Sequence, residues 1–391
     1  MASLRILFIY IDVGGGFSGQ VAATELIVEG PQQRGVDITR GLMPYLNRSG
    51  ATPKCLRALA FGGRLLRAYT RLLFVRLPKQ GAIHLSLGLT RFALVRDGLA
   101  LFCASWLNPR SLRRVVALNG SLFTEWPVNS LNARLFHWVV HSADTVTCVG
   151  SSHRQSLIDL GVPAEKIEVV PNVCEYDGLT AAEVEAKQRC ADGPITCLFL
   201  SSLTDTKGYP EYLEALEKMG SEDGPMIHAV LCGPIMIDAY RKRFETSDEA
   251  KAWIEQKVVS INESERVRIE WIPGARGPEK KTLFERAQIF VLPTQYPVEA
   301  QPLAVIEAMA HGCAIVTTDV GELPSTVSAE SALILSSPTA ASVKEAMEAL
   351  LEDNDLRLGL GLAALDRFNS GFNREQYVQR WSELLGTKGL E

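Results

Sequence analysis

Short apolar runs rich in β-branched residues alternate with helix-like stretches along the chain, and this alternation occurs twice. In the first half the runs are RILFIYI, VDITRGLM, LRRVVALNG, TVTCVGSS and KIEVVPN. In the second half they are ITCLFLSSL, IHAVLCG, VRIEWIPG, IFVLP, AIVTTD and ALILSS. Strands that alternate with helices form parallel sheets covered on both faces. The sequence therefore predicts an α/β protein made of two doubly wound, Rossmann-like domains.

The segment PNVCEYDGLTAAE, residues 171–183, is the expected hinge, because the strand pattern stops there and acidic residues accumulate. A chain of 391 residues is long enough for two hydrophobic cores. We expect a first domain over 1–174, a second over 175–370, and a C-terminal helix over 371–391 that packs back on the first domain. Ligands of such sheets bind beyond the carboxyl ends of the strands, so the cleft between the domains is the expected site.

The composition excludes several classes of protein. Apolar residues make up 47% of the chain and charged residues 22%, which is typical of a globular protein. The eight cysteines form no CxxC pair and are interpreted as reduced thiols of a cytoplasmic protein. The apolar run that follows Arg5 is too short for a signal peptide or a span, and FALVRDGLALFCASWL is interrupted by Arg96 and Asp97.

Charge is divided unevenly between the two halves. Residues 1–174 contain 19 Lys and Arg against 10 Asp and Glu, whereas the remainder contains 21 against 35. Arg64, Arg67 and Arg71 fall on one helical face, opposite the leucines 65, 66, 72 and 73. This pattern fits a solvated face above a core-packing stripe, or contact with an anionic membrane surface or a lipid pyrophosphate. It allows peripheral attachment to the inner face of the plasma membrane. Aromatic residues are not interleaved with the basic ones, so no nucleic-acid partner is expected.

The stretch PVEAQPLAVIEAMAHG, residues 297–312, places two glutamates across the start of an apolar helix. Pro302 is expected at an early helical position, where its missing N–H costs nothing. Glu307 lies beside a predicted packed stripe, so it is either a solvated side chain or a buried carboxylate that needs partners. The free N–H groups of a helix start suit a phosphate. Phosphate at this helix start, with carboxylates on either side to accept hydroxyls, predicts a nucleotide-sugar pocket.

The spacing Glu299-x7-Glu307, followed by AMAHGCAIVTTDVGELP, resembles the donor-site signature of the retaining family 4 glycosyltransferases, which have the two-domain GT-B fold. VVPN, LSSLTDTKGYPEYLEAL and GFNREQYVQRWSELL also lie where that family has them, so the similarity covers nearly the whole chain. It implies a retaining hexosyltransferase that uses a UDP-sugar or a GDP-sugar such as GDP-mannose. The implied acceptor is a saccharide or lipid-linked saccharide, as in bacterial polysaccharide or glycoconjugate synthesis, and no metal or other cofactor is needed.

The same resemblance gives roles to single residues. Glu299 is implied to contact the donor sugar and Glu307 the ribose. Lys207 in TDTKGY, otherwise a solvated turn residue, is implied to stabilise the leaving diphosphate. The family often has an arginine five residues earlier, where this chain has Ser202; either one cation suffices, or Arg276 takes that part. Relatives commonly have histidine where this chain has Asn119, which keeps the hydrogen bonding to the sugar.

Further donor-binding residues are implied around these. Pro302 stands where many members have glycine, so one backbone donor is absent. The remaining expected contacts are Thr294, Ala300, Gln301 and Leu303 near the sugar and diphosphate, and Pro273 near the base.

The loop GGGFSG, residues 14–19, satisfies G-x-G-x-x-G after a strand. In the glycosyltransferase interpretation, Gly15 and Gly16 let the backbone approach the donor diphosphate and the acceptor. An NAD(P)-dependent oxidoreductase that uses this loop is one alternative, and a nucleotide-sugar epimerase of similar architecture is another. A non-catalytic sugar-binding relative is a third. His137 and His141 share a helix face and are expected to be a core or surface pair rather than metal ligands.

Overall fold

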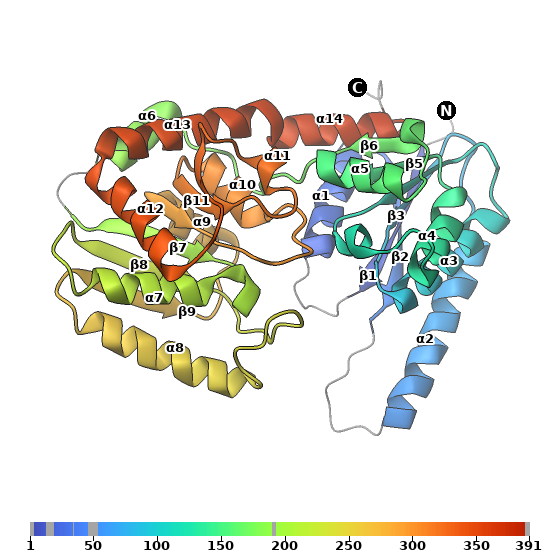
Figure 1. Cartoon of the computed structure of the whole chain (residues 1–391). Helices are drawn as coiled ribbons and strands as arrows, with labels where there is room; N and C mark the ends of the chain where they lie inside the picture. The colour runs from blue at the N-terminus through green and yellow to red at the C-terminus, as the bar shows by residue number, and fades with distance from the viewer. Residues whose placement is uncertain (1–3, 13–18, 34, 46–53, 190–192, 388–391) are drawn as a thin grey trace. The chain divides into compact units, whose positions relative to one another are not determined.

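The computed structural model describes residues 4–12, 19–33, 35–45, 54–189 and 193–387. The chain divides into two compact units: Met1–Asn172 with Glu375–Glu391, and Val173–Arg374. Each unit is built around its own sheet of six parallel strands with helices packed against it (Figure 1). The predicted α/β architecture with two doubly wound sheets is confirmed.

The first unit contains these elements in chain order: β1 (Arg5–Asp12), α1 (Gly19–Gln33), β2 (Asp37–Pro44), α2 (Lys54–Phe74), β3 (Ala82–Ser86), α3 (Arg91–Trp106), β4 (Arg113–Ala117), η1 (Leu122–Glu125), α4 (Leu131–His141), β5 (Thr145–Cys148), α5 (Ser151–Asp159), η2 (Ala164–Lys166), β6 (Ile167–Val169) and, after the second unit, α14 (Arg374–Leu385). Its strands have the order β2-β1-β3-β4-β5-β6. The strands at the centre of the sheet are almost wholly buried, as expected where helices cover both faces.

The second unit contains the others: α6 (Ala181–Gln188), β7 (Ile195–Leu200), η3 (Asp205–Lys207), α7 (Tyr209–Met219), β8 (Ile227–Cys232), α8 (Ser247–Asn262), β9 (Val267–Ile272), α9 (Gly277–Arg286), β10 (Ile289–Val291), α10 (Leu303–Ala310), β11 (Ala314–Thr318), α11 (Leu323–Thr326), β12 (Ala332–Leu335), α12 (Ala340–Glu352) and α13 (Asn354–Gly371). Its strand order is β12-β11-β10-β7-β8-β9. Successive strands are therefore added on one side of β7 as far as β9, and on its other side from β10 onward, so the strand order reverses between β7 and β10.

Helix α14 packs within the first unit, although it follows the second unit in sequence. The Trp381 ring lies 5.2 Å from the ring of His84 on β3. Arg113 on β4 donates a hydrogen bond of 2.9 Å to the Glu383 carbonyl. The expected C-terminal segment was 371–391, and the residues grouped with the first unit begin at Glu375.

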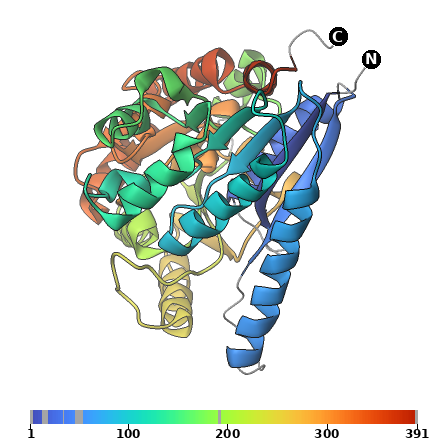
Figure 2. The same ribbon diagram turned by 90° about the vertical axis from the view of Figure 1, so that its right-hand side faces the viewer.

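Helices α2, α3 and α4 lie side by side, with α3 in the middle (Figure 1). The N-terminal half of α2 extends beyond the strands (Figure 2), and most of its side chains are exposed there. Leu72 packs into the core of the unit as expected, but Leu66 is exposed, so the expectation of a leucine face made of 65, 66, 72 and 73 is wrong at that position. Neighbouring residues of a helix are turned by about 100°, which carries Leu66 away from the core. Among the helices of the described residues, none combines the length and the hydropathy that a membrane-spanning segment requires.

Candidate functional site

Two loops meet at the carboxyl end of the second sheet, at the point where its strand order reverses. The loop after β7 carries Lys207, and the loop after β10 carries Thr294 and Glu299. Because β7 and β10 are hydrogen-bonded neighbours, their carboxyl ends lie next to each other. Open α/β sheets bind ligands at this switch point. The strand order thus accounts for the meeting of side chains that are 92 residues apart in sequence.

Lys207 and Glu299 form an ion pair between Nζ and Oε2. Both side chains are largely shielded, with 15% and 7% of their surface exposed. The same Glu299 oxygen accepts a hydrogen bond of 3.2 Å from the Thr294 hydroxyl, and Lys207 Nζ lies 5.0 Å from the centre of the Tyr296 ring. An ion pair with a shared hydrogen bond fixes the positions of both charges. The structure therefore brings together three residues predicted to bind the donor.

Two glycines make this close approach possible. Gly208 follows Lys207 with φ of 85°, and a Cβ there would lie 2.4 Å from the Pro293 carbonyl oxygen. Gly321, after β11, has φ of 61°, and a Cβ there would lie 2.0 Å from the Glu299 carbonyl oxygen. Only glycine adopts such backbone angles at little cost and leaves room for the neighbouring chain. The turn at Lys207 and the loop at Glu299 are both held against other backbone segments.

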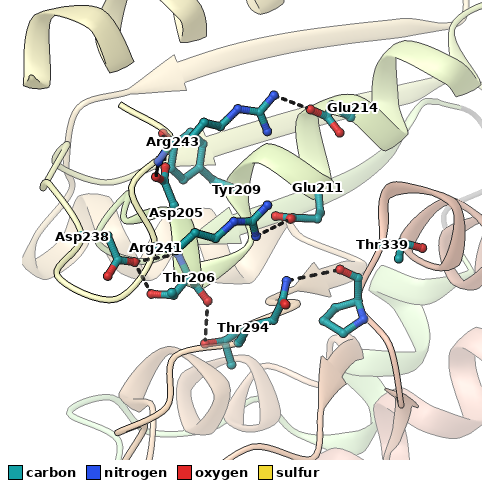
Figure 3. A network of polar contacts seen from close by, with 12 residues as sticks. Asp205, Thr206, Tyr209, Glu211, Glu214, Asp238, Arg241, Arg243, Thr294 and Thr339 are labelled. Carbon is teal, nitrogen blue, oxygen red and sulfur yellow. Dashed lines mark hydrogen bonds and ion pairs between the residues drawn. The ribbon is translucent and has the colours of Figure 1, made fainter. Parts of the chain in front are cut away.

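A network of polar contacts holds the turn that precedes Lys207 (Figure 3). Asp238, in the loop after β8, accepts a hydrogen bond of 2.8 Å from the Thr206 backbone N–H and another from the Thr206 hydroxyl. The Thr206 carbonyl accepts bonds from the Gln295 N–H at 2.6 Å and the Thr294 hydroxyl at 3.3 Å. Burial raises the pKa of Asp238, but the bonds from Thr206 and nearby backbone groups outweigh it and lower that pKa overall. Thr206 thus links both loops of the site.

The loop that carries Asp238 is itself fastened to helix α7 and to the turn η3. Arg241 pairs with Glu211 at 2.7 Å, and Arg243 pairs with Glu214 at 2.7 Å (Figure 3). The Arg243 backbone N–H donates to Asp205 at 2.6 Å. A backbone hydrogen bond to a carboxylate contributes more stabilising free energy than an ion pair between a carboxylate and an exposed cation. The bonds to Asp205 and Asp238 are therefore the stronger fastening.

Glu307 lies in α10 and is buried, with an unusual arrangement of its two oxygens. Oε1 forms an ion pair of 2.5 Å with Lys280 of α9. Oε2 is buried and has no hydrogen-bond partner among the described residues. Burial raises the pKa of Glu307, and Lys280 opposes this rise without cancelling it. The solvated alternative for Glu307 is wrong. A buried carboxylate oxygen without a partner is a place where a ligand hydroxyl can donate.

The remaining predicted donor-binding residues of the second unit differ in burial and in their partners. Pro302 is the residue immediately before α10, whose first helical residue is Leu303, so the proline lies one position earlier than expected. Gln301 is buried and donates to the Thr326 hydroxyl at 3.0 Å, while Ala300 accepts from the Glu322 N–H at 3.1 Å. Three others come earlier in the chain, where Ser202 is half-buried and both Pro273 and Arg276 are exposed.

The predicted site residues of the first unit lie in several different segments of that unit. Asn119 follows β4 and donates a hydrogen bond of 3.3 Å to the Ser86 hydroxyl at the end of β3. Gly15 and Gly16 lie outside the described residues. Arg64, Arg67 and Arg71 are exposed on α2. His137 lies 2.5 Å from the Leu160 carbonyl through Nε2, which gives this ring a partner within the unit.

Lys280 and Asp238 are site residues that the sequence did not indicate. Lys280 sits in EKKTLFER, where two adjacent lysines resemble an ordinary solvated helix surface. Asp238 lies in an irregular loop without periodicity. A buried glutamate on α10 does require a cation nearby. This requirement predicts that a cation lies near Glu307, but it does not indicate which lysine supplies the charge.

Two family models match this chain and together span most of it. The model described as Glycosyl transferases group 1 matches residues 181–366, which include Lys207, Glu299 and Glu307. The model described as Glycosyltransferase Family 4 matches residues 52–176. A comparison with curated proteins gives no match.

Solved structures resemble the chain over almost its whole length. HepE from Anabaena, in complex with UDP and glucose, has a TM-score of 0.67 at 16% identity over 98% of this chain and 100% of its own. Sucrose-phosphate synthase from Thermosynechococcus elongatus has a TM-score of 0.67 at 17% identity, covering 98% of each chain. A glycosyltransferase from Rickettsia africae has a TM-score of 0.64 at 14% identity over 98% of this chain and 99% of its own. The predicted GT-B fold is confirmed.

Proposed function

This chain belongs to the group 1, family 4 glycosyltransferases, and on that premise we propose that it transfers a hexose from a nucleoside diphosphate sugar with retention at the anomeric carbon. The proposed acceptor is a saccharide or a lipid-linked saccharide of bacterial polysaccharide or glycoconjugate synthesis. A UDP-sugar is the first donor to test, because the similar HepE structures hold UDP, UDP-glucose, or UDP with glucose. GDP-mannose and other GDP-sugars are the second.

The observation that carries this proposal is the pair of buried carboxylates in the second unit, of which Glu307 has an oxygen without a partner among the described residues. Glu299 is held by Lys207 and Thr294, and Glu307 is held through one oxygen by Lys280. Each carboxylate accepts hydrogen bonds only, so each suits hydroxyl groups of a ligand. Lys207 lies beside one of them and suits the diphosphate. One nucleotide sugar offers ribose hydroxyls, a diphosphate and sugar hydroxyls in that order.

In the proposed reaction the negative charge that develops on the leaving diphosphate is stabilised by Lys207. A fixed cation at that point lowers the barrier, because it is already oriented when the charge appears. Glu299 orients the sugar and Glu307 the ribose. The leaving phosphate accepts the proton of the acceptor hydroxyl, so no side chain has to titrate. Lys207 takes the part that a metal ion plays in other transferases, and we propose that no metal is required.

On the acceptor side, the positive surface of the first unit is the proposed location for an anionic acceptor or membrane surface. Arg64, Arg67 and Arg71 are exposed on one side of α2. A cytoplasmic enzyme attached peripherally to the inner face of the plasma membrane would meet lipid-linked acceptors there. The role implied for Asn119 is tested by Asn119→Ala with the same donors.

The test is to incubate the protein with a panel of UDP- and GDP-sugars and to measure slow release of the nucleoside diphosphate, with and without EDTA. We expect release from one donor, unaffected by EDTA, and strongly reduced in Lys207→Met. NMR of the product with a saccharide acceptor gives the anomeric configuration, and inversion would contradict the retaining mechanism.

Two outcomes would favour the alternative functions. Binding of NAD(P) with no binding of any nucleotide sugar would support an oxidoreductase. Conversion of one nucleotide sugar into its epimer, without release of diphosphate, would support an epimerase. Ligand binding without either reaction would leave a sugar-binding protein.

A further inference from the structure

Helix α3 of the first unit carries large apolar side chains on the side that faces solvent. Phe92, Val95, Leu99, Phe102 and Trp106 recur every three or four residues, and between 38% and 61% of each is exposed. Residues at this spacing lie on one side of a helix. We call these five residues the apolar face of α3. Surface helices of globular proteins have the opposite arrangement, with polar residues outward.

The charged residues in the middle of α3 point the other way. Arg96 and Asp97 are buried and form an ion pair of 2.6 Å, with 6% and 2% of their side chains exposed. Asp97 also accepts a hydrogen bond of 2.9 Å from the Gly88 N–H. The Arg96 carbonyl accepts another of 3.1 Å from the Tyr69 hydroxyl of α2. These contacts fix the rotation of α3, so its apolar face cannot turn inward.

The apolar surface continues onto the two neighbouring helices. Phe61 of α2 lies 5.8 Å from Phe92, ring to ring. Leu59 and Leu66 of α2 are exposed by 73% and 67%. On α4, Trp138 is 46% exposed. Its ring lies against Gly98 of α3, so close that a Cβ at that position would clash with it. Exposed apolar patches of this extent mark interaction sites.

The charges around this surface have one sign. From residue 54 to residue 143 the only acidic residues are Asp97, which is buried, and Glu125. Arg64, Arg67 and Arg71 are exposed on α2 and make no hydrogen bond or ion pair with the described residues. A second copy of the chain would bring the same positive charges against them, which disfavours self-association. An anionic bilayer offers both a negative surface and an apolar layer.

We infer that α2, α3 and α4 form a docking surface for an anionic lipid bilayer. The apolar face of α3 enters the boundary between headgroups and acyl chains, where Trp and Phe side chains are favoured. Arg64, Arg67 and Arg71 contact the lipid phosphates. The inference deepens the proposed function and rests on it for one point only, that a bilayer presents a lipid-linked acceptor to this unit.

The test uses the full chain and vesicles of phosphatidylcholine, with or without phosphatidylglycerol, in a sedimentation assay. The variant Phe102→Asp/Trp106→Asp changes the apolar face, and Arg64→Gln/Arg67→Gln/Arg71→Gln removes three charges. The matched control is Val259→Asp, since Val259 is 64% exposed on α8 of the other unit. All positions substituted are on the surface, so thermal unfolding is expected to stay unchanged. UDP affinity is measured on every variant.

We expect the wild type to bind the anionic vesicles more tightly than the neutral ones. The arginine variant should bind about 100-fold more weakly, from about fivefold per charge at the membrane surface. The Asp variant should bind at least about tenfold more weakly, because two large apolar side chains no longer leave water. Val259→Asp should bind as the wild type does, and UDP affinity should be unchanged throughout.

Failure of the inference and failure of the proposed function give different results. A wild type that binds UDP but not anionic vesicles would overturn the docking surface alone. A wild type that forms a dimer which Phe102→Asp/Trp106→Asp separates, without vesicle binding, would assign the face to a second copy. Vesicle binding without binding of any nucleotide sugar would instead contradict the proposed function and leave the docking surface standing.

Discussion

Removing Lys280 should destabilise the second unit, because it leaves the carboxylate of Glu307 charged and buried. Lys280→Met keeps the apolar stem and deletes only the ammonium group. The side chain of Glu307 is 3% exposed and that of Lys280 15% exposed, so the pair is largely shielded from water. Removing one partner of a buried ion pair lowers the free energy of unfolding by about 3–5 kcal/mol. For a unit of about 200 residues the lower figure corresponds to a fall in Tm of about 6–12 °C.

The loss should depend on pH in a direction that the structure fixes. Burial raises the pKa of Glu307 above its ordinary value of 4.5, while Lys280 lowers it. A raised pKa in the folded state means that the stability linked to this group is full below the unfolded pKa and is lost as pH rises through the folded pKa. Without Lys280 the folded pKa rises further, so the loss extends to higher pH. The variant should therefore approach the wild type near about pH 5 and fall furthest behind near about pH 8.

Calorimetry of the full chain at both pH values checks this, with a double-mutant cycle as control. Glu307→Gln alone should cost about 1 kcal/mol, because Lys280 can reach water along its stem. Lys280→Met/Glu307→Gln should recover most of the loss, since no charge remains buried. A deficit of Lys280→Met below about 1 kcal/mol, or one equal at both pH values, would refute the reasoning.

Three further predictions concern single positions. Lys207→Met should lower turnover of the donor by about 10²–10³-fold with a smaller effect on UDP affinity, measured by UDP release; unchanged turnover would remove Lys207 from the reaction. Gly321→Ala should lower the free energy of unfolding by about 1–3 kcal/mol and remove most of the turnover, because its Cβ would meet the Glu299 carbonyl. The control Gly359→Ala in α13, which has no atom near its Cβ position, should be neutral or slightly stabilising in thermal unfolding. Burial lowers the pKa of His84 to about 3, so the stability that this neutral ring contributes is lost as pH falls below the ordinary pKa of 6.5. In urea unfolding, the free energy of unfolding of His84→Leu should therefore rise relative to that of the wild type as pH falls from about 7 to about 4. A difference that stays constant over this range would contradict the prediction.

The fold could be predicted from the sequence because its signals are local. Alternating strand and helix patterns define each element, and the right-handed crossovers of such units then limit the strand orders that are possible. The approach of Lys207 to Glu299 belongs to this class. Both residues follow strands that end at the switch point of the second sheet, so topology alone brings them together.

Other contacts could not be predicted, because they depend on how one helix is rotated against another. Lys280 meets Glu307 only through the packing of α9 near α10, and its neighbour Lys281 pairs with Glu285 instead. The same limit applies to α3, where the pattern of charges gave no sign that Arg96 and Asp97 would face the interior. Side-chain direction around a helix that is apolar on all sides has no periodic signal.

The pairing of Lys207 with Glu299 also means that the two charges neutralise each other without a ligand. A small anion such as inorganic phosphate gains little by entering, because it would have to take Lys207 from a partner that already neutralises it. In the proposed function the donor brings a diphosphate for Lys207 and sugar hydroxyls for Glu299, so it would replace both halves of the pair. In the proposed mechanism, Lys207 returns to Glu299 once the sugar has been transferred, so the ion pair that the donor replaces would also favour release of the nucleoside diphosphate.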